Sequence, residues 1–433
     1  MRRLLVGIND DVIGMLSENN DVWSFDYDAA WAKSAGSFDL SPALPRAQLS
    51  HVDGSSKRTV QWYFDNLLPE ETQRVLLSKQ AGIRGDDSFA LIQYLGAESA
   101  GSLVLVPAGE ELTGSGTIAP LSFPDLSRRI QQLPRTSLSH ESPKRMSVAG
   151  AQDKLLVVYK DGQLFEPQGI EPSTHLLKPE HASEDYPNSV INEFAMMTLA
   201  SRVGLHTPLV YRLYVPEPVY VVERFDRELV ANRKTQRRHI VDACQLLNKP
   251  RAYKYSAASL ESLAQCIALC TNKARARLEL FKWLLFNVLI GNDDIHLKNL
   301  SFGISNAGIE ICPFYDLLST AAYHTRAYAD ERAIWPNLQM MIPLPSATTF
   351  AAVNRASLIR AGSALGLTAA IAERELQRMT EKISSELDVV IENIEMANRS
   401  VPEAGGLRQA GDLRLLRVIK HIIFRDMLAQ VSS

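Results

Sequence analysis

The stretch LIGNDDIHLKNLSFG, residues 289–303, joins an apolar helical pattern to a strand-like run and gathers polar side chains between them. Ahead of it, apolar residues recur at helical spacing over 278–288, which predicts a helix with one buried face. A second apolar run, IEICPFYDLLS at 309–319, follows and carries a further aspartate. Loops positioned by rigid elements are where binding and catalytic residues concentrate, so this segment predicts a functional site. Its polar residues are Asp293, Asp294, His296, Lys298, Asn299 and, in the second run, Asp316.

Asp294 and Asn299 have the D-x-x-x-x-N spacing of a protein-kinase catalytic loop. There the aspartate accepts the proton of the substrate hydroxyl, and the asparagine holds Mg²⁺. Asp316 follows an apolar run, as the second metal-binding aspartate requires, and Mg²⁺ favours few carboxylates together with carbonyl oxygens and water. The alternative is a polar loop that ends a helix, with its aspartates only solvated. We interpret Asp293 as a loop residue and His296 as a residue that orders the loop.

A kinase also needs a lysine for the nucleotide phosphates and commonly a glutamate that orients this lysine. The run STHLLKP, residues 173–179, places Lys178 near the end of a short strand, and Glu193 follows fifteen residues later on a predicted helix. An ordinary strand-end lysine is the alternative interpretation of Lys178. The adenine would lie against VVERFDR, residues 221–227, where backbone groups are offered by Glu223, Arg224 and Phe225.

A third segment, KRMSVAGAQDKLLVVYK at 144–160, runs from a loop of small residues into a strand. Loops of this kind often cradle phosphate with bare backbone N–H groups. This one has a single glycine and fits neither G-x-x-x-x-G-K-[ST] nor G-x-G-x-x-G. Ser147 lies three residues ahead of that glycine. The segment alone is therefore compatible with a nucleotide loop, a hydrolase nucleophile or a plain turn.

The bulk composition indicates a globular chain of two or three domains. It has 433 residues, 46% of them hydrophobic, and a net charge of −3, so no overall field attracts nucleic acid or membrane. Four cysteines show no paired CxxC spacing; Cys266 and Cys270 could form half a metal site, but buried thiols in a reducing cytoplasm are favoured. No apolar run approaches the roughly 20 residues that span a bilayer, and no signal peptide is recognisable. We expect a soluble, cytoplasmic protein.

The order of the patterns along the chain is mixed, then strand-rich, then helical. Short strand-like runs come first, at 4–8 and 22–25, with a helical stretch at 70–81. A Gly/Ser/Thr/Pro-rich segment at 108–122 indicates a linker. Strand signals dominate 147–225, interrupted by one helix, NSVINEFAMMTLASRVGL. Beyond about residue 230 the pattern is helical, as at 261–287, 369–398 and the basic segment 411–428.

Together these motifs, in this order, resemble the HipA family of serine/threonine kinases, which are the toxin subunits of bacterial type II toxin–antitoxin pairs. The matching pieces are SVAGAQDK, STHLLKP, INEF, VVERFDR, GNDDIHLKNLSF and FYDLLS. The resemblance covers nearly the whole chain and implies an α+β, two-lobed protein-kinase-like fold with an extra N-terminal α/β subdomain. The domains would be the N-terminal subdomain at 1–107, a strand-rich N-lobe at 108–226 and an all-helical C-lobe at 227–433.

The resemblance also implies roles for single residues, with ATP and Mg²⁺ as cofactors. Asp294 would be the catalytic base, Asn299 and Asp316 would bind Mg²⁺, and Ser147 would be autophosphorylated, which in the family holds the loop out of the ATP site. Two departures are Asp153, where Glu is more usual, and Asp293, where Thr is common. The residues facing the nucleotide and its metal would be Ala149, Gly150, Ala151, Gln152, Asp153, Lys154, Lys178, Glu223, Arg224, Phe225, His296, Lys298, Asn299 and Asp316.

The family further implies a helix-turn-helix antitoxin as partner, which would contact operator DNA and suits an acidic kinase chain. In some members the substrate is glutamyl-tRNA synthetase, and the activity inhibits growth and promotes persistence. For the basic segment 411–428, with Arg414, Arg417, Lys420 and Arg425, we favour a solvated helix face over a DNA-facing patch. Three other interpretations of the function stay open: a small-molecule kinase, a catalytically weak co-repressor module, and a metal hydrolase built on DDIHLKN.

Overall fold

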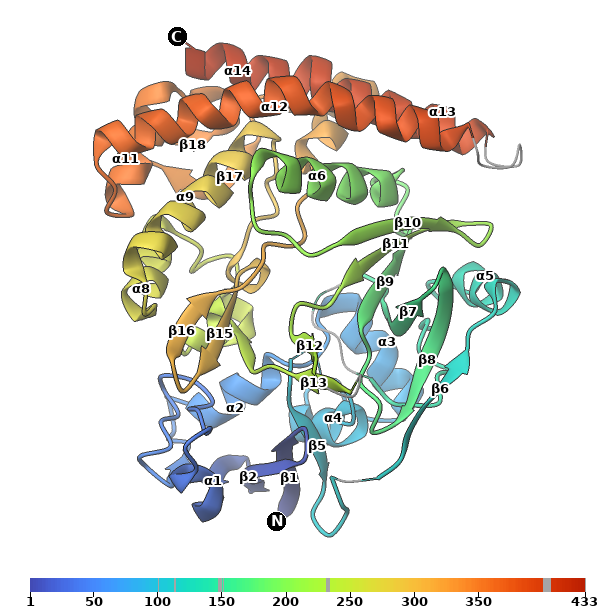
Figure 1. The fold of residues 1–433 in the computed structure, drawn as a ribbon, viewed down its shortest axis with the longest axis vertical. Coiled ribbons are helices and arrows are strands. Elements are labelled where there is room, and N and C mark those ends of the chain that lie inside the picture. The colour runs from blue at the N-terminus through green and yellow to red at the C-terminus, as the bar shows by residue number, and fades with distance from the viewer. Residues whose placement is uncertain are drawn as a thin grey trace. The chain divides into compact units, whose positions relative to one another are not determined.

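The strand-like runs at the start of the chain form a five-stranded antiparallel sheet in the computed structural model, which describes residues 1–99, 101–112, 114–146, 150, 152–230, 234–399 and 406–432. The elements of this region are β1 Arg2–Ile8, β2 Asp11–Asn19, β3 Val22–Tyr27, β4 Ser50–Val52, β5 Val104–Pro107, α1 Ala29–Lys33, α2 Thr59–Asp65, α3 Glu71–Ala81 and α4 Ser88–Leu95. The strand order is β4-β3-β2-β1-β5, and α2 and α4 pack against the sheet (Figure 1). Leu4 and Val6 of β1 and Phe25 of β3 are fully buried, because alternate side chains of a strand share one face.

A second sheet follows, and it confirms the strands expected between residues 147 and 225. Its elements in the first compact unit of the chain are β6 Gly116–Pro120, β7 Leu155–Lys160, β8 Gln163–Gly169, β9 His175–Pro179 and β11 Pro218–Glu223, with α5 Phe123–Gln131 beside them. The order is β11-β9-β7-β8-β6. The linker expected at 108–122 is wrong in part, because β6 pairs with β8 from Gly116 opposite Gly169 to Pro120 opposite Phe165. Its Gly- and Pro-containing sequence suits an edge strand, where fewer N–H groups need partners.

The chain forms two compact units built from separated segments. The first comprises Met1–Pro179, Leu213–Tyr253 and Ser301–Cys312, and the second Glu180–Arg212, Lys254–Leu300 and Pro313–Ser433. The boundary crosses β10, Val210–Tyr214.

The expectation that residues 227–433 are all helical is wrong. This part of the first unit contains α7 Ala243–Leu246 and the strands β12 Arg227–Leu229, β13 Thr235–Arg237, β14 Ile240–Asp242, β15 Ser301–Ser305 and β16 Gly308–Ile311. Each strand has three to five residues, too short for a clear alternation. The tight β15–β16 turn is closed by Gly308 at a φ of +111°, a conformation that glycine adopts without strain.

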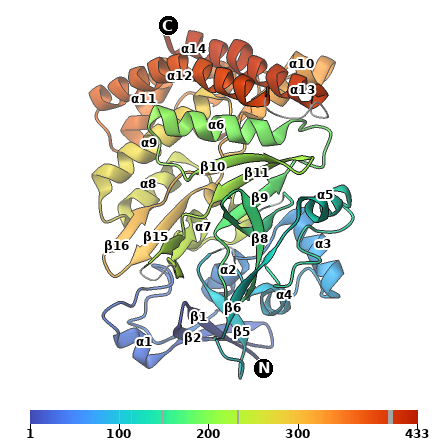
Figure 2. The ribbon, with the colours of Figure 1, turned by 45° about the vertical axis from the view of Figure 1, so that its right-hand side comes forward.

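Helices dominate the second unit. They are α6 Ser189–Val203, α8 Leu260–Leu269, α9 Lys273–Leu289, α10 Arg326–Ala329, α11 Arg355–Ala364, α12 Ala369–Asn398, α13 Gly406–Val418 and α14 Arg425–Ser432, with a hairpin of β17 Gln339–Leu344 and β18 Ala347–Thr349. The helix predicted at 369–398 is confirmed, and Thr368 caps it by accepting the Ile371 N–H. Trp283 and Phe281 of α9 are fully buried, and α6 packs along α12 (Figures 1 and 2).

The helix expected over 261–287 is two helices instead. α8 ends at Leu269, and α9 begins after Asn272, whose side chain accepts the Arg275 N–H. The Asn272 cap is a local signal for this break. Cys266 and Cys270 are buried, as expected for structural thiols.

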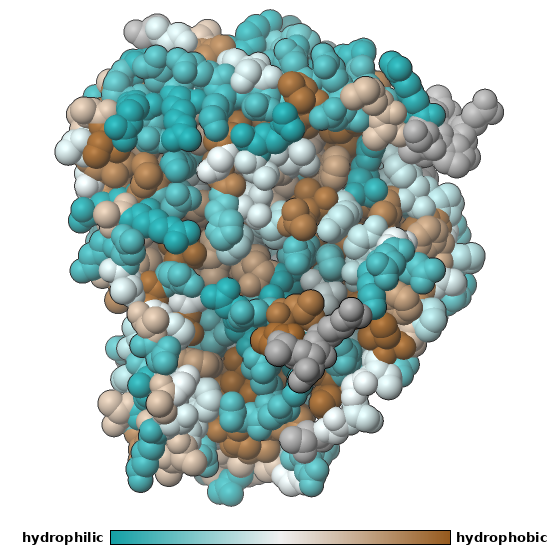
Figure 3. Space-filling model, in the orientation of Figure 1, coloured by the Kyte–Doolittle hydropathy of each residue, from teal (hydrophilic) through white to brown (hydrophobic). Residues whose placement is uncertain are grey.

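The basic residues near the C-terminus pair with neighbouring groups of their own unit. Arg417 forms an ion pair with Glu395 at 3.7 Å, Lys420 pairs with Asp388, and Arg414 donates to the Ala327 carbonyl at 2.6 Å. The surface over α12 is largely hydrophilic (Figure 3). These contacts support a solvated, charge-paired helix face. Within the described ranges, no helix is both long and apolar enough to cross a membrane.

Candidate active site

The predicted catalytic loop begins at Gly291, directly after α9. Its φ is +66°, and a Cβ at this position would lie 2.7 Å from Ile423 Cγ2 and 2.9 Å from Ala321 Cβ. The Gly291 carbonyl accepts the Ala321 N–H at 2.9 Å. A side chain therefore cannot be accommodated here without shifting the neighbours, and the loop leaves α9 in one fixed direction.

Buried polar side chains hold the next residues of the loop. Asn292 donates through Nδ2 to Asn287 Oδ1 at 2.8 Å and accepts the Asp294 N–H on its own Oδ1 at 3.1 Å. Thr320 Oγ1 accepts the Asp293 N–H at 2.8 Å. Asn287 and Asn292 are almost fully buried, so these hydrogen bonds form away from water and fix the backbone beside Asp294. Sequence reasoning missed Asn287 and Thr320, because neither belongs to a recognisable motif.

Asp294 and Asn299 lie together, as their spacing predicted. Asn299 Nδ2 donates to the Asp294 carbonyl at 2.9 Å, so its side-chain oxygen is the atom chemically suited to a metal ion. The Tyr255 hydroxyl donates to Asp294 Oδ1 at 2.9 Å, and the Tyr255 ring meets the His296 ring edge-on, with centroids 4.9 Å apart. Tyr255 stands 39 residues before Asp294, and no local signal identified it. The ring contact agrees with a loop-ordering role for His296.

The environment raises the pKa of the Asp294 carboxyl to about 6. Burial against protein atoms is the main cause, and the negative charge of Asp316 is the second, since a like charge nearby disfavours ionisation. The Tyr255 hydrogen bond opposes this rise because it stabilises the carboxylate. The side chain is nonetheless solvent accessible. A carboxylate in this position has raised proton affinity, which a general base needs.

Asp316 lies in the same unit, directly after the buried Phe314 and the half-buried Tyr315. Its φ of +59° is left-handed, a conformation that aspartate tolerates better than most residues and that recurs at functional sites. The Tyr315 hydroxyl donates to the carbonyl of Lys298 at 2.7 Å, which ties this segment to the catalytic loop. The Lys298 side chain is buried, and its predicted contact with the nucleotide stays a prediction.

The chemistry of the donor set fits Mg²⁺. Among the residues described, no group of three or more His, Cys, Asp or Glu could by itself enclose a metal ion. Mg²⁺ is held by one or two carboxylates together with substrate phosphates and water. The Asp316 carboxylate and the Asn299 amide oxygen provide such a partial set, and the neighbouring charge of Asp294 favours a cation further.

The segment expected to face the phosphates is described only in part. Ser147, Ala149 and Ala151 lie outside the described residues. Gly150 has a φ of +104°, and its carbonyl accepts the Glu70 N–H of the N-terminal region at 3.3 Å.

The following residues connect this segment to the second sheet. Gln152 Nε2 donates to the Pro179 carbonyl, one residue after Lys178, at 3.3 Å. Asp153 is buried, and burial raises its pKa, although a hydrogen bond with Gln73 opposes the rise. The structure thus brings Gln152 close to the strand that carries Lys178, while nucleotide contacts of Gly150, Asp153 and Lys154 stay predictions.

Lys178 is buried on β9, opposite Tyr220 of β11, with its Nζ 5.8 Å from the centre of the Tyr220 ring. A buried lysine at the end of a central strand is uncommon unless it is paired. Glu193 is likewise buried, on α6 of the second unit. The ion pair predicted between them stays a prediction.

The predicted adenine-contacting residues differ in their surroundings. Glu223 is exposed at the end of β11 and Phe225 is half-buried. Arg224 is buried; its N–H donates to the Thr174 carbonyl at 2.9 Å, and its carbonyl accepts the Arg227 N–H at 3.3 Å. Both backbone groups of Arg224 are thus engaged within the first unit. The predicted adenine contacts of Glu223, Arg224 and Phe225 stay predictions.

A carboxyl beside the N-terminus of α6 gives a pH-dependent prediction. Burial raises the pKa of Glu180 to about 7, with Asp412 adding to the rise, although Ser189 donates to it through N–H and Oγ at 2.7 and 3.1 Å. A folded-state pKa above the unfolded value means that this carboxyl favours folding when protonated and loses that contribution as pH rises through about 7. Glu180→Gln should therefore raise the free energy of unfolding at pH 8 by about 1–3 kcal/mol and change it less at pH 5. Urea denaturation at both pH values measures this.

The exposed Glu184→Gln is the matched control for that measurement and should be neutral at both pH values. Equal effects of Glu180→Gln at pH 5 and pH 8 would show that the carboxyl is not held protonated.

Comparison with known proteins gives matches along most of the chain. Residues 4–106 match the HipA N-terminal domain, and residues 146–387 match the HipA-like C-terminal domain. A putative kinase, Y4mE of Sinorhizobium fredii, is 34% identical over 75% of this chain and 78% of its own. The serine/threonine-protein kinase toxin HipA of Shewanella oneidensis is 32% identical over 73% of this chain and 75% of its own.

A solved structure supports the fold. It is that of the Shewanella oneidensis HipA, HipB and operator DNA complex, which superposes with a TM-score of 0.78 at 28% identity and covers 99% of both chains. The similarity therefore extends over the sheets and helices of the whole chain.

Proposed function

Because the chain belongs to the HipA family of serine/threonine-protein kinases, we propose that it transfers the terminal phosphoryl group of ATP to a protein hydroxyl with Asp294 as general base. The observation that carries this assignment is the loop in which Asn299 binds the Asp294 backbone and Tyr255 binds its carboxylate. The Asp294 carboxylate, which has a raised pKa, is suited to accept the proton of an attacking serine hydroxyl. We also propose that the α+β fold is a two-lobed kinase fold.

The remaining residues position the nucleotide. Asn299 and Asp316 would hold Mg²⁺, which when bound neutralises phosphate charge during transfer. Lys178 would bind the phosphates, since its ammonium group lies on a fixed strand. Glu223 and Phe225 would orient the adenine. Each of these residues would hold a charge or a hydrogen-bond donor in position before the reaction, and such positioning accelerates phosphoryl transfer.

Ser147 gives a prediction about self-control. Because of its place in the family motif, we propose that Ser147 is autophosphorylated. A phosphoserine carries about −1.5 to −2 charges and repels the ATP phosphates, so this modification would oppose ATP binding. Ser147→Ala should lose most of the label that wild type incorporates into its own chain, yet still phosphorylate an added protein substrate. Phosphopeptide mapping measures this. Label that persists mainly on another serine would contradict the assignment.

We further propose that the chain is the toxin of a toxin–antitoxin pair. The relative from Shewanella oneidensis is named a kinase toxin, and the similar solved structure contains HipA, HipB and operator DNA. A HipB-like helix-turn-helix antitoxin would make most of the DNA contacts, since this chain has a net charge of −3. The protein substrate would include an aminoacyl-tRNA synthetase, with growth inhibition and persistence as the outcome.

Labelled ATP added to a cell extract with the purified chain tests the substrate class. The proposal predicts new labelled protein bands that depend on Mg²⁺. Label found only in small metabolites would instead indicate a small-molecule kinase. Toxicity that survives a catalytically inactive variant would indicate a co-repressor module.

A further inference from the structure

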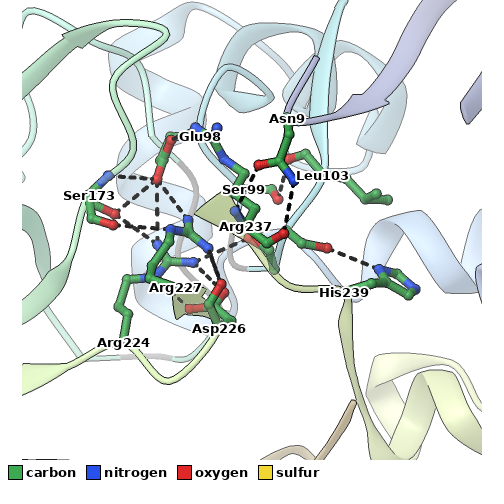
Figure 4. Close-up of polar contacts among 12 residues, drawn as sticks. Asn9, Glu98, Ser99, Leu103, Ser173, Arg224, Asp226, Arg227, Arg237 and His239 are labelled. Carbon is green, nitrogen blue, oxygen red and sulfur yellow. Dashed lines mark hydrogen bonds and ion pairs between the residues drawn. The ribbon is translucent and has the colours of Figure 1, made fainter. Parts of the chain in front are cut away.

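Glu98, in the segment after α4, is a fully buried carboxylate at the centre of a cluster of charged side chains (Figure 4). Its Oε2 accepts from Lys144 Nζ at 2.9 Å and from an Arg237 guanidinium nitrogen at 2.7 Å. Its Oε1 accepts from Arg227 at 2.9 Å and from the N–H and Oγ of Ser173 at 3.1 and 2.9 Å. Five donors therefore converge on one carboxylate.

A second carboxylate, Asp226, completes the cluster. Arg224 binds it with two nitrogens at 3.0 and 2.7 Å, and Arg227 lies 2.9 Å from its Oδ2. Ser173 links the two halves, because its Oγ accepts from Arg224 at 3.0 Å and donates to Glu98. The orientation of Arg224 thus depends on Glu98 through Ser173 and through Arg227 (Figure 4).

Charge balance makes this arrangement sensitive to Glu98. The cluster defined here has two carboxylates, Glu98 and Asp226, and four basic side chains, which are Lys144, Arg224, Arg227 and Arg237. These cations hold the pKa of Glu98 well below its usual range. Burial lowers the pKa of Lys144 and brings that of Arg227 to about 10. Removing one negative charge would leave buried cations that must move or find other partners.

The cluster joins segments that lie far apart in the sequence. Glu98 lies within residues 4–106, the part similar to the HipA N-terminal domain. Lys144 stands three residues before Ser147, and Arg224 stands between the adenine-contacting candidates Glu223 and Phe225. The Arg224 backbone is also fixed, because its N–H donates to the Thr174 carbonyl next to Ser173.

We infer that Glu98 is a positioning residue of the nucleotide site: from the N-terminal domain it fixes Arg224, and with it the segment 223–225 that orients ATP. The inference rests on the proposed kinase function. It gives the N-terminal domain a role in ATP binding, since Glu98 supports the Arg224 guanidinium directly at 3.7 Å and through Ser173. Glu98 touches neither substrate nor nucleotide in this account, so it acts on ATP affinity and not on the chemical step.

The test is Glu98→Gln in the full chain, which removes the charge but keeps the shape. The KM for ATP and the ATP dissociation constant should rise by about tenfold or more, because hydrogen bonds to a charged group are lost. The kcat at saturating ATP should stay within about threefold, since Asp294 is untouched. All assays are made below the temperature at which each variant starts to unfold.

Glu166→Gln is the matched control. Glu166 is also buried in the first unit, but its partners differ from those of Glu98: it binds Arg129 through both carboxylate oxygens at 2.8 and 2.9 Å and accepts from Ser142 Oγ at 2.6 Å. It should lower thermal stability and leave the KM for ATP unchanged. Ser173→Ala is a milder variant that changes no charge. Its ATP KM should rise by about threefold, because Ser173 Oγ no longer donates to Glu98 or accepts from Arg224.

The outcomes separate the two claims. An ATP affinity that is the same in wild type, Glu98→Gln and Ser173→Ala would overturn the inference and leave the kinase function intact. An equal rise of KM in Glu166→Gln would also overturn it, because any buried ion pair would then have the same effect. If wild type binds ATP but transfers no phosphate, the kinase function fails, while calorimetric ATP binding by the variants still decides the role of Glu98.

Discussion

Asp294→Asn is expected to slow phosphoryl transfer by roughly 10²–10⁴-fold while ATP binding stays within about threefold of wild type. The amide cannot accept the proton of the substrate hydroxyl, but it has nearly the same shape as the carboxyl. Its oxygen can still accept the hydrogen bond of Tyr255, and Asn299 binds the backbone carbonyl of residue 294, which does not change. The loss should therefore appear in kcat and not in folding. Transfer of label from ATP at saturating substrate measures kcat, and calorimetry measures binding.

Asp293→Asn is the matched control for this experiment. It removes a charge of the same kind from the adjacent position, whose backbone N–H is held by Thr320. This variant should keep most of its activity. Transfer that persists unchanged in Asp294→Asn, or that is lost equally in Asp293→Asn, would show that Asp294 is not the base.

The second large effect is expected at Asp316. Asp316→Asn should lower activity by roughly 10²-fold or more at ordinary Mg²⁺ concentrations, since it removes a carboxylate that would hold the Mg²⁺ by which phosphate charge is neutralised. Raising the Mg²⁺ concentration should restore part of the activity, because the weakened site can still be filled. Asparagine is the proper substitution here, since the backbone has a φ of +59° and asparagine tolerates the left-handed conformation that alanine disfavours.

Asp330→Asn provides the control for backbone geometry. Asp330 is an exposed aspartate of the second unit that also has a positive φ, +46°. Its replacement should change neither activity nor Mg²⁺ dependence. An Asp316→Asn enzyme whose Mg²⁺ titration matches that of wild type would exclude Asp316 as a metal ligand.

The proximity of Asp294 and Asn299 in the loop after α9 could be predicted, because the signal for it is local. Asp294 and Asn299 are five residues apart, so one short motif specifies both, and the structure joins them by a hydrogen bond. The helix at 369–398 was predictable for a similar reason. Its apolar face repeats over thirty residues, and Thr368 supplies the cap.

What could not be predicted depends on pairing between distant residues. Strands such as β6 and β15 have only five residues, and their partners, not their own sequence, make them strands. Tyr255 reaches Asp294 where the Leu297 N–H donates to the carbonyl of Lys254 and joins the two segments. No spacing rule links these residues.

The Glu98 cluster shows the same limit more strongly. Arg237 lies 139 residues after Glu98, and each of the two residues alone looks like an ordinary surface charge. Arg224 was predicted as part of the adenine-contacting segment. Only the fold shows that its guanidinium forms a buried ion pair with Asp226. The contact of Arg224 with ATP stays a prediction, and the supporting role is the one that we infer from the ion pair.

The most direct test of the central claim is the intact mass of the purified chain. The protein is first treated with phosphatase, which is then removed, and is incubated with ATP and Mg²⁺. Wild type should gain one phosphate, located on the peptide that contains Ser147, and Asp294→Asn should gain none. A wild-type mass that does not change, in a preparation that binds ATP, would show that the chain does not phosphorylate itself.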